Sequence, residues 1–388
     1  MVFRKLLFVM AGICVFFLFA CAPKPLKPAA EFDTPMHHIS TGMKLLKSGN
    51  IDGAFFEFNR AKELDPEYSP AYAGIGLVHG FRNDFKKGLT AMTAAGKFAK
   101  DGEEEAEANV GYMRLYMIGK EKIEKKWLKY VEKRFKRAVK ASPDMPDPYF
   151  YMGLAYKMNY DFQKAAIQFS KVLDLDKGFV AEADKEYEIV QKIERAMPGS
   201  KVGKKIALVE KITRADIAAL FIEELKVDQY LKKRTPKEFD TSFKSPEKNF
   251  YTGEYVKAPS ALDIDNHVLK ADIDAAIETG IKGLQPFPDH KFRPYKTITR
   301  AEYAMMLEDI LIKITGVDEL ATRYIGSISP FPDLRNDLPY YNAVMICTTC
   351  GFMVAEDLAT GEFNPMGTIS GADALLSIRA FKTELQKY

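Results

Sequence analysis

Cysteine, histidine and tryptophan are scarce in this 388-residue chain, which has four, five and one of them. Four cysteines are too few for a disulfide-stapled scaffold of this length. The histidines show no metal-ligand spacing, and a single Trp127 provides no aromatic platform for carbohydrate. The sequence has no phosphate-binding loop, nucleophile elbow, zinc-protease motif or dinucleotide fingerprint. We therefore expect a protein that is not an enzyme and that uses no cofactor and no metal.

Excess charge of either sign is also absent. The chain has 56 Lys and Arg against 53 Asp and Glu, a formal net charge of +3. This balance excludes a protein whose whole surface receives a polyanion, and we expect no nucleic-acid partner. Its 47% apolar and 28% charged residues are ordinary for a globular chain, and its length predicts two or three domains.

The one long apolar run stands at the N-terminus. Two basic residues precede 15 apolar ones that end at Ala20, whereas a membrane-spanning helix needs about 20. Residues 1–20 are therefore predicted to be an export signal, the alternative being an uncleaved anchor helix. The proline-rich stretch 21–34 cannot continue a helix and is predicted to be a stiff tether.

Leu18-Phe19-Ala20-Cys21 at the end of this run resembles the lipobox of bacterial lipoproteins. The resemblance implies that Cys21 carries a lipid that anchors the chain to a membrane. Because alanine follows Cys21, it also implies sorting to the outer membrane, with the protein facing the periplasm.

Residues 35–198 contain a repeat of 34 residues. Gly42 and Gly76 are one period apart, and Gly153 lies two periods and nine residues beyond Gly76. Large and small apolar residues recur after these glycines: Ala54, Phe58, Ala61 and Pro66 in the first copy, Ala165 and Phe169 in the last. The pattern resembles the tetratricopeptide (TPR) repeat, which implies a solenoid of helical hairpins with a protein ligand on its concave face. Residues 179–197 are predicted to form a capping helix.

The stretch from Lys120 to Lys140 has ten Lys and Arg residues against three Glu. Trp127, Val131 and Ala138 share one helical face within it. Two interpretations stay open: a contact with anionic lipid or acidic polymer, or a repeat helix whose solvated side is basic.

A second repeat occupies residues 199–388. Thr213-Arg214-Ala215-Asp216, Thr299-Arg300-Ala301-Glu302 and Ser370-Gly371-Ala372-Asp373 each precede an apolar helical pattern. All three predict a capping box, in which the Ser or Thr and the acidic residue bond each other's backbone N–H.

Arg214 and Arg300 stand where a cation opposes the helix dipole. Each predicts either an anion-binding site at a helix N-terminus or a salt bridge to a neighbouring carboxylate. On this basis neither arginine is expected to be needed for stability.

The order of an acidic turn, a helix, a glycine, a Phe-x-Pro element and Thr-Arg-Ala-Glu resembles the S-layer homology domain. Its elements here are Asp263, a helix near 271–279, Gly280 and Phe292-Arg293-Pro294, then Asp333, Gly351 and Phe363-Asn364-Pro365. The resemblance implies a helical pseudo-threefold prism that binds peptidoglycan or a secondary cell-wall polymer. The implied binding residues are Arg214, Arg300, Thr213, Thr299, Asp216 and Glu302. The third copy departs from the pattern, because Ser370-Gly371 replaces Thr-Arg.

We therefore expect a mainly α protein, with a TPR solenoid followed by an S-layer-homology-like prism. The leading hypothesis is an outer-membrane scaffold that binds the wall through the prism and a protein through the TPR repeats. The alternative is a TPR adaptor for envelope assembly or secretion, whose prism has lost wall binding.

Overall fold

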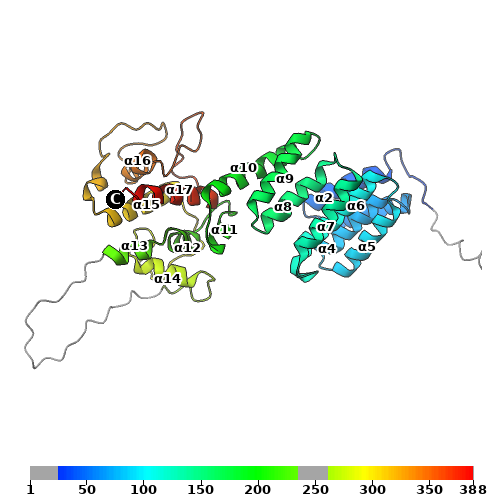
Figure 1. Cartoon of the computed structure of the whole chain (residues 1–388), viewed down its shortest axis with the longest axis horizontal. Coiled ribbons are helices and arrows are strands. Elements are labelled where there is room, and N and C mark those ends of the chain that lie inside the picture. The colour runs from blue at the N-terminus through cyan, green and yellow to red at the C-terminus, as the bar shows by residue number, and fades with distance from the viewer. Residues whose placement is uncertain (1–24, 235–260, 388) are drawn as a thin grey trace, which may run out of the picture. The chain divides into compact units, whose positions relative to one another are not determined.

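The structure, a computed structural model, describes residues 25–234 and 261–387 (Figure 1). These residues form helices, turns and isolated bridges, and they include no β-strand. The chain divides into two compact units, one up to Tyr187 and one from Glu188. The predicted mainly α fold is confirmed.

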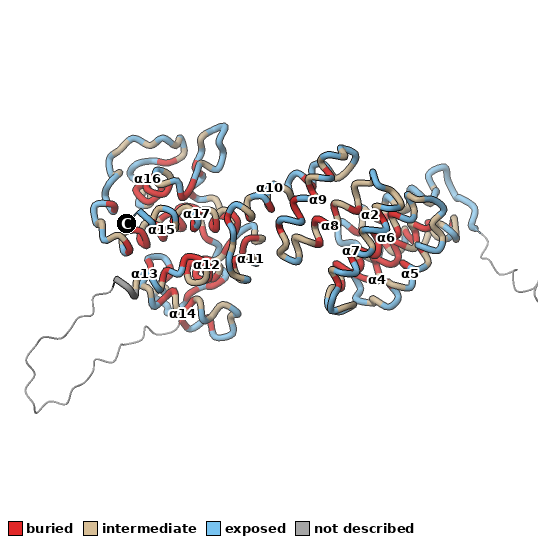
Figure 2. The backbone as a smooth tube through the Cα atoms, viewed as in Figure 1, coloured by how far each residue is buried: buried red, intermediate tan, exposed pale blue. Residues whose placement is uncertain are grey.

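The first unit consists of helices that pair in chain order. Its helices are α2 (Pro35–Lys47), α3 (Ile51–Leu64), α4 (Ser69–Phe81), α5 (Phe85–Phe98), α6 (Gly102–Gly119), α7 (Trp127–Ala141), α8 (Pro146–Met158), α9 (Phe162–Leu175) and the start of α10 (Val180–Ala196). Asn50, Asp84 and Asp161 cap the second helices of three pairs, each accepting a hydrogen bond from a backbone N–H three residues on. The buried residues lie where helices face one another (Figure 2).

Each pair also contacts the next, so the first helices α2, α4, α6 and α8 form one layer. The second helices α3, α5, α7 and α9 each pack on their own first helix. We call these the first-helix layer and the second-helix layer. This arrangement confirms the predicted solenoid of helical hairpins.

The repeating glycines are where helices approach most closely. A Cβ atom on Gly42 or on Gly74 would lie 2.5 Å from the ring of Phe58, which is fully buried between them. A Cβ atom on Gly153 would likewise lie 2.5 Å from the ring of Phe169. The aromatic ring therefore fills a space that exists because the facing helix has no side chain there.

The nine-residue insertion lies between α6 and α7. A short 3-10 turn (Lys120–Lys122) follows α6, and Ile123 packs over Gly119, whose Cβ would lie 2.4 Å from Ile123 Cδ1 if one were present. The pair α6–α7 nevertheless stays closely packed, because Trp127, Val131 and Ala138 are buried.

Residues 25–34 precede α2 and contain no helix. Asp33 anchors this segment, since its carboxylate accepts hydrogen bonds from Arg60 Nη2 at 2.5 Å and pairs with His38 Nε2 at 2.8 Å. The predicted signal 1–20 and lipid site Cys21 lie outside the described residues. No helix between residues 25 and 234, or between 261 and 387, is long and apolar enough to cross a membrane.

The second unit begins inside α10, whereas the sequence placed the boundary after residue 198. The end of α10 is tied to this unit because Lys192 Nζ lies 2.9 Å from the carboxylate of Asp373. The other helices of the unit are α11 (Lys201–Ile206), α12 (Arg214–Leu220), α13 (Val227–Arg234), α14 (Lys270–Glu278), α15 (Arg300–Thr315), α16 (Tyr341–Thr349) and α17 (Gly371–Leu385), with a π-helical turn (Phe221–Leu225) and a 3-10 turn (Asp318–Thr322).

The three segments that lead into α12, α15 and α17 meet in a closed ring. Ile298 N donates to Ile212 O at 3.0 Å, and Ile212 N donates to Ile369 O at 3.1 Å. Arg300 N donates to Gly367 O at 2.9 Å, which closes the ring between the second and third segments. Each segment is thus bonded to both others, in a threefold pattern.

In the second and third copies of the repeat, an aspartate fixes the backbone of a loop in the same way. The carboxylate of Asp263 accepts hydrogen bonds from two successive backbone N–H groups, and that of Asp333 does the same. The donors are Phe292 and Arg293 for Asp263, and Phe363 and Asn364 for Asp333. The acidic turn therefore holds in place the loop that precedes Thr299-Arg300 in one copy and Ser370-Gly371 in the other.

Candidate functional site

The predicted capping boxes form at the first two boxes. Thr213 accepts from the N–H of Asp216, whose carboxylate accepts from the N–H of Thr213 at 2.8 Å. Thr299 and Glu302 are related in the same way. In these two boxes the four side chains cap α12 and α15.

The third box is only half formed, which corrects the expectation of three complete boxes. Ser370 accepts from the N–H of Asp373 at 3.1 Å. The carboxylate of Asp373 instead accepts the hydroxyl of Ser370 at 2.5 Å and pairs with Lys192.

Arg214 is buried, and its guanidinium bonds backbone carbonyl groups of the second copy. Nε donates to Phe292 O at 2.8 Å and Nη2 to Gln285 O at 3.0 Å, while Nη1 donates to Gly283 O. Its guanidinium carbon lies 4.6 Å from the centre of the Phe292 ring. Burial lowers the pKa of Arg214 to about 10, so it stays charged at neutral pH.

These contacts correct two expectations. Arg214 pairs with carbonyl oxygens rather than with a carboxylate, and all three of its guanidinium nitrogens are already bonded. A buried cation with satisfied donors stabilises the fold, so its removal should be costly. Arg214 is therefore poorly placed to hold a wall polymer.

Arg300 also donates to backbone carbonyl groups, but only through two of its three guanidinium nitrogens. Nε donates to Phe363 O at 2.8 Å and Nη2 to Val354 O at 2.6 Å. Glu356 lies 4.0 Å from Nε, so the salt-bridge interpretation applies here at the limit of an ion pair. Nη1 has no bond to the described residues, and Arg300 lines a cavity.

Gly371 occupies the place of these arginines in the third copy. A Cβ atom there would overlap the carbonyl oxygen of Ile206. Gly371 N donates to Val209 O at 2.8 Å, so this close approach belongs to the threefold ring. The third copy therefore has no arginine because the backbone leaves no room for any side chain.

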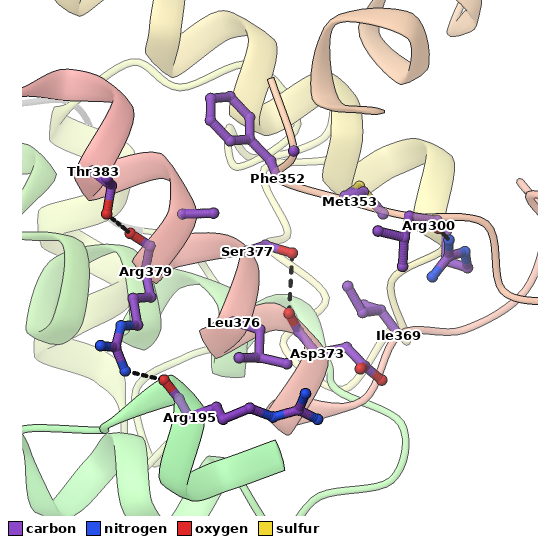
Figure 3. Close-up of a pocket in the computed structure, with 13 residues that line it drawn as sticks. Arg195, Arg300, Phe352, Met353, Ile369, Asp373, Leu376, Ser377, Arg379 and Thr383 are labelled. Carbon is purple, nitrogen blue, oxygen red and sulfur yellow. Dashed lines mark hydrogen bonds between the residues drawn. The ribbon is translucent and has the colours of Figure 1, made fainter. Parts of the chain in front are cut away.

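The cavity beside Arg300 has a volume of about 460 Å³ and lies in the second unit (Figure 3). We call it the arginine cavity, because Arg195, Arg300 and Arg379 line it. Arg379 Nη1 donates to the backbone carbonyl of Arg195, and the Arg195 guanidinium pairs with no carboxylate of the described residues. Asp373 also lines the cavity. Three guanidinium groups around one cavity can receive a carboxylate or a phosphate.

The first-helix layer has a cation of its own. Arg114 of α6 reaches Met43 of α2, with Nη1 3.8 Å from the sulfur, and its guanidinium lies 4.9 Å from the ring centre of Tyr151 in α8. Arg114 thus bridges three first helices without an ion pair to any carboxylate that the structure describes.

An acidic cavity of about 600 Å³ lies where α6, α8 and α10 begin. Glu107 and Asp147 line it, together with Glu103, Glu182 and Asp144, the last of which pairs with the lining Lys177 at 3.5 Å. Burial, reinforced by Asp147 and Glu103, raises the pKa of Glu107 to about 7. This cavity can receive a basic side chain, whose charge would offset that of the carboxylates.

Sequence reasoning missed Arg114, Arg195 and Arg379. Arg195 and Arg379 are 184 residues apart and meet only through the fold. Arg114 lies in an apolar helical pattern with no motif around it. Over the residues that the structure describes, no group of three or more His, Cys, Asp or Glu side chains is arranged to hold a metal ion.

No protein-family model matches the chain, and no curated protein is significantly similar to it. Solved structures do align with it, among them YrrB and PilF. YrrB, described as a TPR protein with an unusual peptide-binding site, shares 18% identity, with 45% of this chain and 87% of YrrB covered and a TM-score of 0.25. PilF of Pseudomonas aeruginosa shares 14% identity, with 43% of this chain and 93% of PilF covered and a TM-score of 0.20. The helical-hairpin fold of residues 35–175 is established by their own helix pairs.

Proposed function

We propose that this chain is a non-catalytic adaptor of the bacterial cell envelope that holds a segment of a protein partner against its first-helix layer. The export signal and the lipobox-like Cys21 support the location. In repeat solenoids the concave surface carries the ligand, and a layer of first helices offers such a surface.

The observation that carries this proposal is Arg114. The Arg114 guanidinium has one weak bond to a thioether and stacks on an aromatic ring, and its charge also acts on Asp147, so most of its N–H donors are left for a carboxylate of a partner. The acidic cavity around Glu107 would take a basic side chain of the same partner. We therefore expect a protein segment that carries both acidic and basic residues.

Site-specific photo-crosslinking in the producing cell tests this proposal. A benzoylphenylalanine at Tyr151, beside Arg114, should crosslink a defined partner, whereas one at Phe56 should not. Phe56 is 68% exposed and belongs to α3 in the second-helix layer. The additional change Arg114→Ala should reduce the Tyr151 crosslink at least about tenfold, as expected for a lost charge-assisted bond. Equal crosslinking from both positions, or no effect of Arg114→Ala, would contradict the proposal.

A second candidate function is binding of wall polymer in the arginine cavity. The observation in its favour is that Arg195, Arg300 and Arg379 all line one cavity. Carboxylates and phosphates of wall polymers suit three guanidinium groups. This candidate replaces the set Thr213, Asp216, Thr299 and Glu302, whose side chains serve as caps.

Co-sedimentation with purified peptidoglycan sacculi, with and without secondary polymers, measures this second function. The free energy of unfolding of the double variant Arg195→Ala/Arg379→Ala should lie within about 1 kcal/mol of the wild-type value, because both side chains are at the surface. The variant should lose at least about tenfold in sacculus binding. The control Arg293→Ala/Arg335→Ala removes the same charge from exposed positions and should bind normally. Equal binding by all three proteins would exclude the arginine cavity as the site.

A further inference from the structure

One face of α7 and the turn before it carries an unbroken row of cations. The exposed members are Lys122, Lys125, Lys126, Lys129, Lys133, Lys136, Arg137 and Lys140. Glu121, Glu124 and Glu132 are the nearby acids, and the carboxylate of Glu132 accepts the hydroxyl of Tyr156 at 3.1 Å. We call these eight residues the basic face.

The opposite side of α7 is already used by the repeats. Trp127 is 5% exposed, and Val131 and Ala138 are fully buried. Lys129, Lys133, Lys136 and Lys140 follow one another at intervals of four, three and four residues, so they form a stripe along the helix. The stripe spans about 16 Å at 1.5 Å per residue.

The cations of the basic face have no ion-pair partner among the described residues, whereas lysines elsewhere on the unit often do. Lys100 pairs with Asp65 at 3.1 Å, and Lys164 with Asp161 at 2.7 Å. The basic face also borders a hollow of about 640 Å³, which exposes part of Tyr130. Uncompensated charge concentrated on one face raises the local potential and attracts an anionic surface.

We propose that the basic face binds the surface of a membrane rich in anionic phospholipid. Seven of its eight cations are lysines, which act as flexible point charges and are depleted in protein–protein interfaces. Tyr130, at 39% exposure, is the one large apolar side chain on α7 that is exposed. The face therefore lacks the cluster of apolar side chains that would become buried in a protein partner. The face lies on α7 of the second-helix layer and the turn before it, whereas Arg114 belongs to α6 of the first-helix layer, so this inference does not rest on the partner site proposed above.

Vesicle co-sedimentation tests this inference with the chain from Ala22 to its end, which keeps every described residue and lacks Cys21. The probes are vesicles of equal parts phosphatidylglycerol and phosphatidylcholine, and vesicles of phosphatidylcholine alone. We expect binding to the first only, with loss as salt rises and shortens the Debye length. Lys129→Glu/Lys133→Glu/Lys136→Glu should weaken binding about a hundredfold or more, since each lysine near an anionic membrane contributes about fivefold.

The control variant is Lys44→Glu/Lys86→Glu/Lys171→Glu, which makes the same change in net charge at exposed lysines on α2, α5 and α9. It should keep binding within about fivefold of wild type, because its charges are dispersed. Equal loss in both variants would overturn the inference in favour of overall charge. Binding to soluble polyglutamate without binding to vesicles would overturn it in favour of an acidic polypeptide. Circular dichroism of both variants should match wild type, which checks that they stay folded.

Discussion

Replacing Arg214 by alanine should lower the free energy of unfolding of the second unit by about 3 kcal/mol. The substitution leaves three backbone carbonyl groups without their donor, at Phe292, Gly283 and Gln285. It also removes the packing of the guanidinium on the Phe292 ring. The favourable change in the helix dipole, about 0.3–1 kcal/mol, is too small to compensate. Calorimetry should show a fall of about 6–12 °C in the melting of this unit.

Two further variants separate this role from charge alone. Arg214→Lys keeps the cation but cannot present a planar fork to several carbonyl groups, so it should also destabilise. Arg293→Ala removes a neighbouring arginine that is half-exposed and pairs with Asp289, and it should cost less than about 1 kcal/mol. Melting of Arg214→Ala at the wild-type temperature would show that the bonds to the carbonyl groups do not stabilise the unit.

The helix caps could be predicted from sequence because they are local. Thr213 and Asp216 are three residues apart, and a capping box needs no information from elsewhere in the chain. The helical-hairpin period was equally accessible, since Gly42 and Phe58 of one pair recur as Gly153 and Phe169 of another.

The role of the arginines could not be predicted in this way. The acceptors of Arg214 lie 69 to 78 residues further along the chain, and one of them, Phe292, lies where the backbone is fixed by Asp263. The sequence showed only an unfavourable position in a helix, and the tertiary contacts that outweigh it were invisible. The same limit applies to Gly371, where glycine is needed because a Cβ atom would overlap the carbonyl oxygen of Ile206.

The division between the two units was also beyond sequence reasoning. Pro198-Gly199 looked like a boundary because these residues end helices. The structure instead carries α10 without interruption across the division, and Lys192 in its second half pairs with Asp373. A helix that serves two units has no break in composition to mark where one ends.

Replacing Phe58 by alanine should cost the first unit about 3–5 kcal/mol, or about 6–20 °C in melting temperature. The ring is fully buried, and the residues that face it from α2 and α4 are Gly42 and Gly74. Glycines have no side chain that could move into the cavity, so the structure relaxes little and the cost should lie near the upper end of this range. Phe56→Ala, two residues away on α3 and 68% exposed, is the matched control and should cost less than about 0.5 kcal/mol.

Gly74→Ala should change the free energy of unfolding in opposite directions with and without the Phe58 ring. In the wild type the new Cβ would lie 2.5 Å from the Phe58 ring, so the substitution should destabilise by about 1–3 kcal/mol. In the Phe58→Ala background the same methyl group enters the cavity and replaces a helical glycine, so it should stabilise by about 1 kcal/mol. The difference is a coupling energy of about 2–4 kcal/mol in a double-mutant cycle measured by denaturant unfolding. Additive effects would mean that ring and glycine do not share one space, and that the repeated glycines need another explanation.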